Sequence, residues 1–134
     1  MKNRILIILG IIVIGLILIF IFVKPKTETW KINLPNSYTL EKITEEKYIL
    51  ENKDNSKTKI EEYIAEYSYG KKYISIKCAK NENNNIIVYF YIIDSENNDI
   101  YGPYNDEETY NKVKEKIIDE EISEWIKTSN NIDK

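Results

Sequence analysis

The residues of this sequence best suited to chemistry are its carboxylates, which include three adjacent pairs: Glu45/Glu46, Glu61/Glu62 and Glu120/Glu121. Two carboxyl groups can serve as acid and base when they face each other across a cleft and have separated pKa values. Neighbouring residues on a strand point to opposite faces, so these pairs do not meet that condition. We interpret them as solvated surface.

A further acidic segment, DSENND at residues 94–99, could supply oxygen ligands to calcium from three carboxylates: Asp94, Glu96 and Asp99. A calcium loop of the EF-hand type also needs a central Gly and a closing Glu, which this segment lacks. Its position between two β-rich runs favours a hairpin turn, with Ile93 opposite Ile100 and Ile92 opposite Tyr101. We predict the turn and keep the calcium site as the alternative.

Other residue types that support catalysis are scarce. The chain has no histidine and one cysteine, Cys78, and its only arginine is Arg4. This composition excludes Ser-His and Cys-His nucleophiles, histidine-ligated metals, an internal disulfide and a cysteine-rich zinc site. We predict no enzyme activity, no cofactor, and no catalytic, cofactor-binding or metal-binding residue, and we expect Cys78 to lie in the core.

The tyrosines, 11 in all, are the remaining candidates. We expect Tyr73, Tyr89 and Tyr91 to fall on one side of the predicted hairpins. Aromatic surfaces can bind sugars, peptides or protein partners. The alternative is a half-buried sheet face beneath a helix. An exposed patch of these three tyrosines is our candidate interaction surface.

The elements that must position these residues are mostly strands. Residues 29–34, TWKINL, alternate so that Trp30, Ile32 and Leu34 share one side, and short strands are expected over 37–43 and 47–52. A hairpin centred on Gly70-Lys71 would place Cys78 on a shared apolar face, through three pairs: Tyr67 with Ile74, Ala65 with Ile76, and Tyr63 with Cys78.

Residues 86–93, IIVYFYII, have no polar side, which predicts a central strand covered on both faces. The expected cover is an amphipathic helix over residues 105–128, capped by Asn105 with Glu108 three positions later, as in a capping box. We therefore predict an α+β fold, with an N-terminal transmembrane helix and an antiparallel β-meander of about six or seven strands packed against one C-terminal amphipathic helix.

The amino-terminal region has its own pattern. Residues 5–23 form an uncharged apolar run, long enough as a helix to cross a bilayer, after the basic residues Lys2 and Arg4. No small-residue cleavage site follows, so we predict an uncleaved signal anchor over residues 1–23 and a domain outside the cytoplasm. Residues 24–29 are interpreted as a linker, 30–128 as the domain and 129–134 as a disordered tail.

The charge of the domain excludes one class of partner. The first 23 residues hold two of the 19 basic residues and none of the 22 acidic ones, which leaves 17 against 22, or −5, for the rest. A nucleic-acid binder needs a basic face to neutralise phosphates, so we predict no nucleic-acid partner.

Three stretches occur in this order: INLPNSYTL at residues 32–40, YGKKYISIK at 69–77, and residues 89–113 with YGPY before an acidic helix start. Their order resembles an uncharacterised family of small membrane-tethered or lipoprotein-like domains of low-GC Gram-positive bacteria. The family's marks are similar to Leu-Pro-Asn-Gly-Tyr, Asp-x-x-Tyr-Ile and Tyr-x-Ile-Asp followed by Tyr-Gly-Pro. Here Ser37 replaces the Gly, Gly70 replaces the Asp, and the lipobox cysteine is missing. The resemblance implies a tethered domain and supplies no activity.

These observations favour a single-pass membrane protein whose extracytoplasmic domain binds a protein or cell-wall partner without catalysis. The main alternative is a membrane-tethered immunity protein, since an acidic domain would suit a basic toxin or bacteriocin. A subunit of a membrane complex and an enzyme are the remaining hypotheses.

Overall fold

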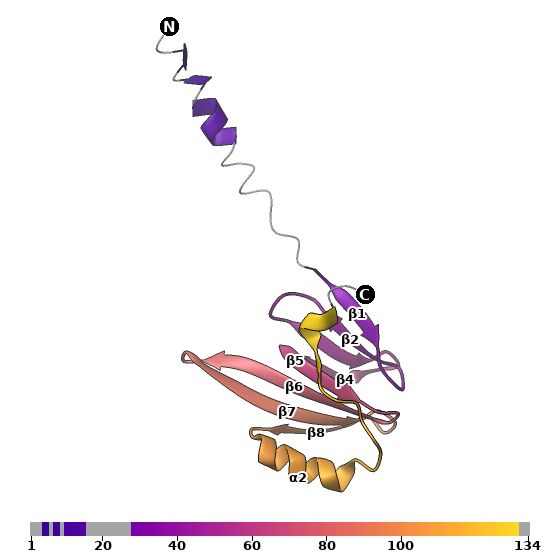
Figure 1. Ribbon diagram of the computed structural model, residues 1–134. Coiled ribbons are helices and arrows are strands. Elements are labelled where there is room, and N and C mark those ends of the chain that lie inside the picture. Colours follow the sequence, from indigo (N-terminus) through magenta and orange to yellow (C-terminus); the bar gives the residue numbers. More distant parts are fainter. Residues whose placement is uncertain (1–3, 6, 9, 16–27, 132–134) are drawn as a thin grey trace.

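The computed structural model describes residues 4–5, 7–8, 10–15 and 28–131 of the chain. Residues 10–15 are helical. In residues 28–131, two antiparallel sheets and the helix α2 form successive layers (Figure 1). The first sheet has the order β1-β2-β3-β4, with bounds Trp30–Asn33, Tyr38–Lys42, Tyr48–Asn52 and Asn55–Glu62. The second has the order β8-β7-β6-β5-β9, with bounds Asp99–Tyr104, Asn85–Asp94, Tyr73–Glu82, Ile64–Tyr69 and Ile126–Lys127. The helix α2 spans Glu107–Ile117.

The predicted fold class is therefore wrong in its sheet. A single meander was expected, but the chain leaves the first sheet after Glu62 and begins the second at Ile64. The facing sides of the two sheets share one core, to which Leu40, Leu50 and Ile76 belong. Alternation tells which residues share a face, but it does not tell which sheet a strand joins, because that depends on contacts distant in sequence.

The predicted transmembrane helix is not seen either. Within residues 4–5, 7–8, 10–15 and 28–131, no helix combines the length and apolar character needed to cross a bilayer. A span needs about 20 residues of continuous apolar helix, and the longest described stretch of the expected span is residues 10–15. Residues 1–3, 6, 9 and 16–23 of the expected anchor and 24–27 of the expected linker lie outside the described residues.

The C-terminal helix is shorter than predicted. It is capped by Asp106, whose Oδ1 accepts a hydrogen bond from the Thr109 backbone N–H at 2.7 Å, and it ends at Ile117 in place of residue 128. The apolar residues beyond it still reach the core, but from extended chain, and Ile126 pairs with Tyr67. Of the expected disordered tail, residues 129–131 belong to a 3-10 helix, Thr128–Asn131, and residues 132–134 lie outside the described residues.

The β5–β6 register differs from the prediction by two residues, so that Tyr67 pairs with Ile76 and Tyr69 with Ile74. The turn is longer than expected, because the Gly70 N–H donates to the Tyr73 carbonyl. From Glu66 to Tyr69 this shift of two keeps each side chain on its face, but a bulge between Ile64 and Glu66 places Ile64 opposite Cys78, where Tyr63 was predicted. Cys78 is accordingly fully buried, as predicted.

Two other predictions are confirmed. The β7–β8 hairpin pairs Ile93 with Ile100 and Ile92 with Tyr101. Strand β7 lies between β6 and β8 and is covered on both faces over its second half. The first sheet covers one of these faces and α2 covers the other, where Phe90 stacks on Tyr110 with ring centroids 4.8 Å apart.

Candidate functional site

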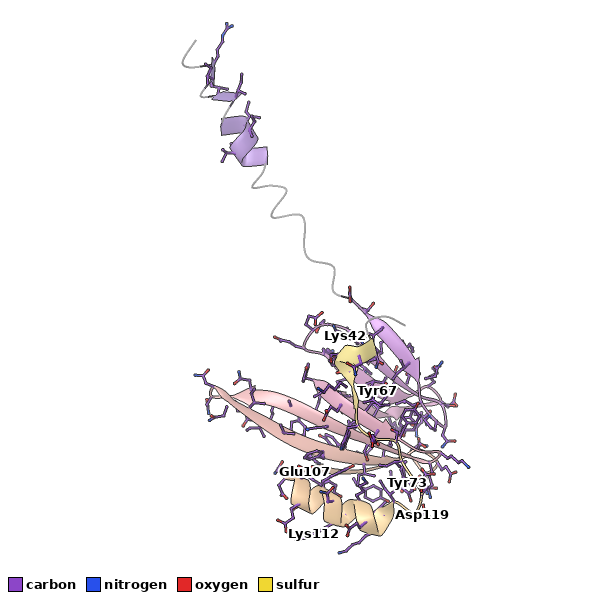
Figure 2. All side chains as sticks on the ribbon, in the orientation of Figure 1. Lys42, Tyr67, Tyr73, Glu107, Lys112 and Asp119 are labelled. Carbon is purple, nitrogen blue, oxygen red and sulfur yellow. The ribbon has the colours of Figure 1, made fainter. Side chains whose placement is uncertain are left out.

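The three tyrosines proposed as one surface lie on two faces of the second sheet. Tyr89 and Tyr91 face the first sheet and meet edge to face, with ring centroids 6.0 Å apart. Tyr73 belongs to the opposite core, beneath α2, and is only 5% exposed (Figure 2). The prediction that the three share one side is therefore wrong for Tyr73, whose register partner is Asp94 and not a residue on the Tyr89 face.

Glu62, the last residue of β4, connects the other two tyrosines. The Tyr89 hydroxyl donates to Glu62 Oε2, and the Tyr91 hydroxyl donates to Glu62 Oε1 at 3.1 Å. Cys78 is the β6 partner of Tyr89 and lies on the same face. A carboxylate at the end of the first sheet is thus held by two phenols of the second sheet.

The interpretation of Glu61 and Glu62 as solvated surface is right for only one of them. Glu61 is exposed and pairs with Lys47 Nζ at 3.0 Å and with Lys59. Glu62 points the other way, toward the core. The sequence held a signal for this, since Glu62 follows the buried Ile60 by two residues and residues two apart on a strand share a face.

The β6–β7 hairpin extends beyond the first sheet (Figure 1). A groove of about 580 Å³ is lined in part by Glu62 and by residues of this hairpin. Its lining comes from both sheets: Glu45, Glu46, Glu62, Tyr63, Ala79, Lys80, Asn81, Ile86 and Tyr89. Tyr63 is 38% exposed and Ile86 is 76% exposed. The groove therefore presents aromatic and aliphatic side chains that are accessible from solvent.

The groove has an acidic rim. Glu45 and Glu46 lie in the turn between β2 and β3, and Glu45 accepts from Lys42 Nζ at 2.9 Å. Lys80 is the one lysine of the lining; its Nζ lies 2.7 Å from Glu82 and 5.7 Å from the centre of the Tyr89 ring. Three carboxylates against one ammonium leave the described lining net acidic.

The titratable groups beside Glu62 act as donors. Burial and the neighbouring Glu62 carboxylate raise the pKa values of Tyr89, Tyr91 and Cys78 well above their usual range. All three therefore keep their protons at neutral pH, and none offers a phenolate or thiolate for nucleophilic or base catalysis. The arrangement is suited to binding.

The segment at 94–99 forms the predicted turn. Asp94 Oδ1 accepts from the backbone N–H groups of Glu96 and Asn97, both at 3.1 Å, and Lys72 Nζ lies 3.4 Å from Oδ2. Burial alone would raise the pKa of Asp94, but the hydrogen bonds from Asn97 and Lys72 outweigh it and lower that pKa. Among the described residues, no group of three or more Cys, Asp and Glu side chains is placed to hold a metal ion.

Sequence reasoning missed the role of Glu120, which had been interpreted as surface. Its carboxylate accepts backbone N–H groups from the β5–β6 turn: Lys71 at 3.1 Å, Lys72 at 2.8 Å and Tyr73 at 2.9 Å. This contact fixes one end of the hairpin whose other end forms the groove. Its partners lie about 50 residues earlier in the chain, which no local pattern reveals.

No protein-family model, curated protein or solved structure matches this chain. The resemblance to small tethered bacterial domains and the expected location outside the cytoplasm stay predictions.

Proposed function

We propose that this chain is a non-catalytic binding domain whose groove holds a basic segment of a protein partner. The observation that carries the proposal is the combination, in one groove, of exposed aromatic and aliphatic side chains with a rim of carboxylates. Aromatic surface supplies contact area, and an acidic rim attracts lysine and arginine side chains and disfavours acidic ligands. A basic toxin recognised by an immunity protein is one partner of this kind.

The groups around Glu62 are held as proton donors, since burial and the Glu62 carboxylate raise the pKa values of Tyr89, Tyr91 and Cys78. Because the Glu62 carboxylate already accepts from two phenols, the wall of the groove is ordered before any ligand arrives. Preorganised walls lose little side-chain entropy on binding.

The test is a titration of the isotope-labelled chain with a short peptide of alternating lysine and valine, followed by NMR. We expect shifts at the groove residues and binding that weakens with added salt. Glu46→Lys should weaken binding about fivefold, or about 1 kcal/mol, the effect expected of an exposed charge pair.

The matched control is Glu115→Lys, which makes the same charge change on the exposed face of α2. A peptide of alternating glutamate and valine serves as the ligand control. If Glu115→Lys weakens binding as much as Glu46→Lys, the attraction comes from net charge and the groove is not the site. If the lysine peptide does not bind, the proposal fails.

A further inference from the structure

The groove runs along the edge of β6, at a point where no other strand of the described chain pairs with that edge. Strand β5 pairs with β6 only as far as Ile64 opposite Cys78, and the Ala79 N–H then donates to the Tyr63 carbonyl at 3.2 Å. Before this point the chain belongs to β4, where Glu62 pairs with Tyr48 of β3. In the described part of the chain, no strand therefore lies beside Asn81 on this side of β6.

The backbone groups of Asn81 point to that open edge. Residues two apart on an antiparallel strand direct their N–H and C=O groups to the same side, so Asn81 follows Ala79. The geometry of the β6–β7 turn leads to the same orientation for Asn81. Asn83 and Asn84 have positive φ, and the flanking Glu82 and Asn85 are register partners. Residues that flank a two-residue turn exchange both hydrogen bonds, which leaves Asn81 facing away from β7.

We propose that the basic partner segment binds as an added β-strand along β6, pairing its backbone with the N–H and C=O groups of Asn81. This inference rests on the function proposed above and specifies how the ligand is held. Strand addition to an exposed edge derives affinity from main-chain hydrogen bonds and selectivity from alternate side chains.

The geometry also predicts where the lysine or arginine side chains of the partner segment lie. The partner residue opposite Asn81 has its side chain on the Asn81 face of the sheet, and the residues on either side of it lie on the Lys80 face. That second face is the one the first sheet packs against, and Glu45 and Glu46 lie in the β2–β3 turn of that sheet. Lysine or arginine at alternate positions of the partner therefore meets the acidic rim, which is why the occupant is assigned as a basic extended segment.

The decisive variant is Asn81→Pro. Proline removes the N–H group that faces the open edge and leaves the bonds to β7 intact, and edge strands tolerate proline in that position. The residue before it, Lys80, is already extended, as a residue preceding proline prefers to be. Asn81→Ala is the matched control, since it removes the side chain and keeps the N–H. Circular dichroism and NMR spectra establish that both variants are folded.

We expect the lysine-valine peptide to bind Asn81→Pro at least about fivefold more weakly than Asn81→Ala, the effect of one lost backbone hydrogen bond. In the unsubstituted chain, hydrogen exchange of the Asn81 amide should slow when the peptide is added. Equal binding by the two variants, or an Asn81 amide that exchanges at the same rate with and without peptide, would overturn strand addition and leave the groove proposal standing. No binding to the unsubstituted chain would reject both. Concentration-dependent protection of Asn81 without peptide would assign the edge to a second copy of the chain.

Discussion

Replacing Glu120 tests how firmly the turn opposite the groove is fixed. Its Oε1 accepts from Lys72 and Tyr73, and its Oε2 accepts from Lys71. A hydrogen bond to a charged group contributes about 1.5–3 kcal/mol, and an ordinary one about 1 kcal/mol. The Lys71 N–H is exposed and can bond to water in the variant, so its loss costs little. The bonds from Lys72 and Tyr73 remain to be counted, each at about 1–2 kcal/mol because they are only partly buried. We expect Glu120→Ala to lower the free energy of unfolding by about 2–4 kcal/mol.

The pH dependence has a definite sign. Burial acts to raise the pKa of Glu120, but the hydrogen bonds from Tyr73, Lys72 and Lys71 outweigh it and lower that pKa. A carboxyl group with a lowered folded-state pKa stabilises the fold above its unfolded pKa, and this contribution is lost as the pH falls through the folded value. Glu120→Gln keeps an acceptor oxygen and loses the charge. Its stability should therefore be below that of the unsubstituted chain at pH 7 and should approach it below about pH 4.

Urea unfolding followed by tryptophan fluorescence measures both effects. Glu121→Ala is the control, because Glu121 is adjacent and exposed. An unchanged midpoint for Glu120→Ala at pH 7 would refute the reasoning. So would a difference between Glu120→Gln and the unsubstituted chain that is the same at pH 7 and at acid pH.

Two further predictions concern the groups around Glu62. Cys78 should react with a thiol reagent only as the chain unfolds in urea, because it is fully buried and its pKa is raised; rapid labelling of the native chain would contradict this. Tyr89→Phe should destabilise the fold by about 1.5–3 kcal/mol, the value of a hydrogen bond to a charged group, and this loss should shrink in a Glu62→Gln background. Additive effects of Tyr89→Phe and Glu62→Gln would show that the two side chains do not interact.

Local patterns predicted the strands of this protein well and their partners less well. The alternation at Trp30 and Ile32 and the apolar run of β7 depend only on neighbours in sequence, and both are observed as strands. The division into two sheets depends on one step of the chain, at Tyr63, and a bulge between Ile64 and Glu66 follows it. No Gly or Pro marks that step, so no local turn signal in the sequence indicated it.

The helix prediction failed for a similar reason. Apolar residues up to Ile126 keep helical spacing, but the spacing does not distinguish a helix from extended chain that reaches the core. After Ile117, competing contacts are available from distant residues. Glu120 binds the β5–β6 turn, and the Ser123 N–H donates to the Tyr69 carbonyl. These tertiary bonds replace the backbone bonds that a longer helix would make.

The predicted exposed patch of three tyrosines is not observed, because Tyr73 and Tyr89 are buried and Tyr73 lies on the other face of the sheet. Tyr89 and Tyr91 were identified from their shared face, and the structure brings them together on Glu62. Tyr73 was wrongly grouped with Tyr89 and Tyr91. Their partners on β6 are Cys78 and Ile76, and Tyr73 is an odd number of residues from both, so its side chain lies on the other face. Following the alternation of β6 through the turn would have separated Tyr73 from the others.

The step of the chain from the first sheet to the second also explains why the groove lies where it does. Because the chain crosses at Tyr63, β5 is too short to cover the whole of β6, and Asn81 is left at an open edge. The same crossing places Glu62 at the last position of β4, within reach of the phenols of β7. A longer β5 would close the edge and remove Glu62 from the tyrosines together. The open edge and the ordered acidic wall therefore have one structural cause, and the extended basic segment that we propose as the ligand would use both.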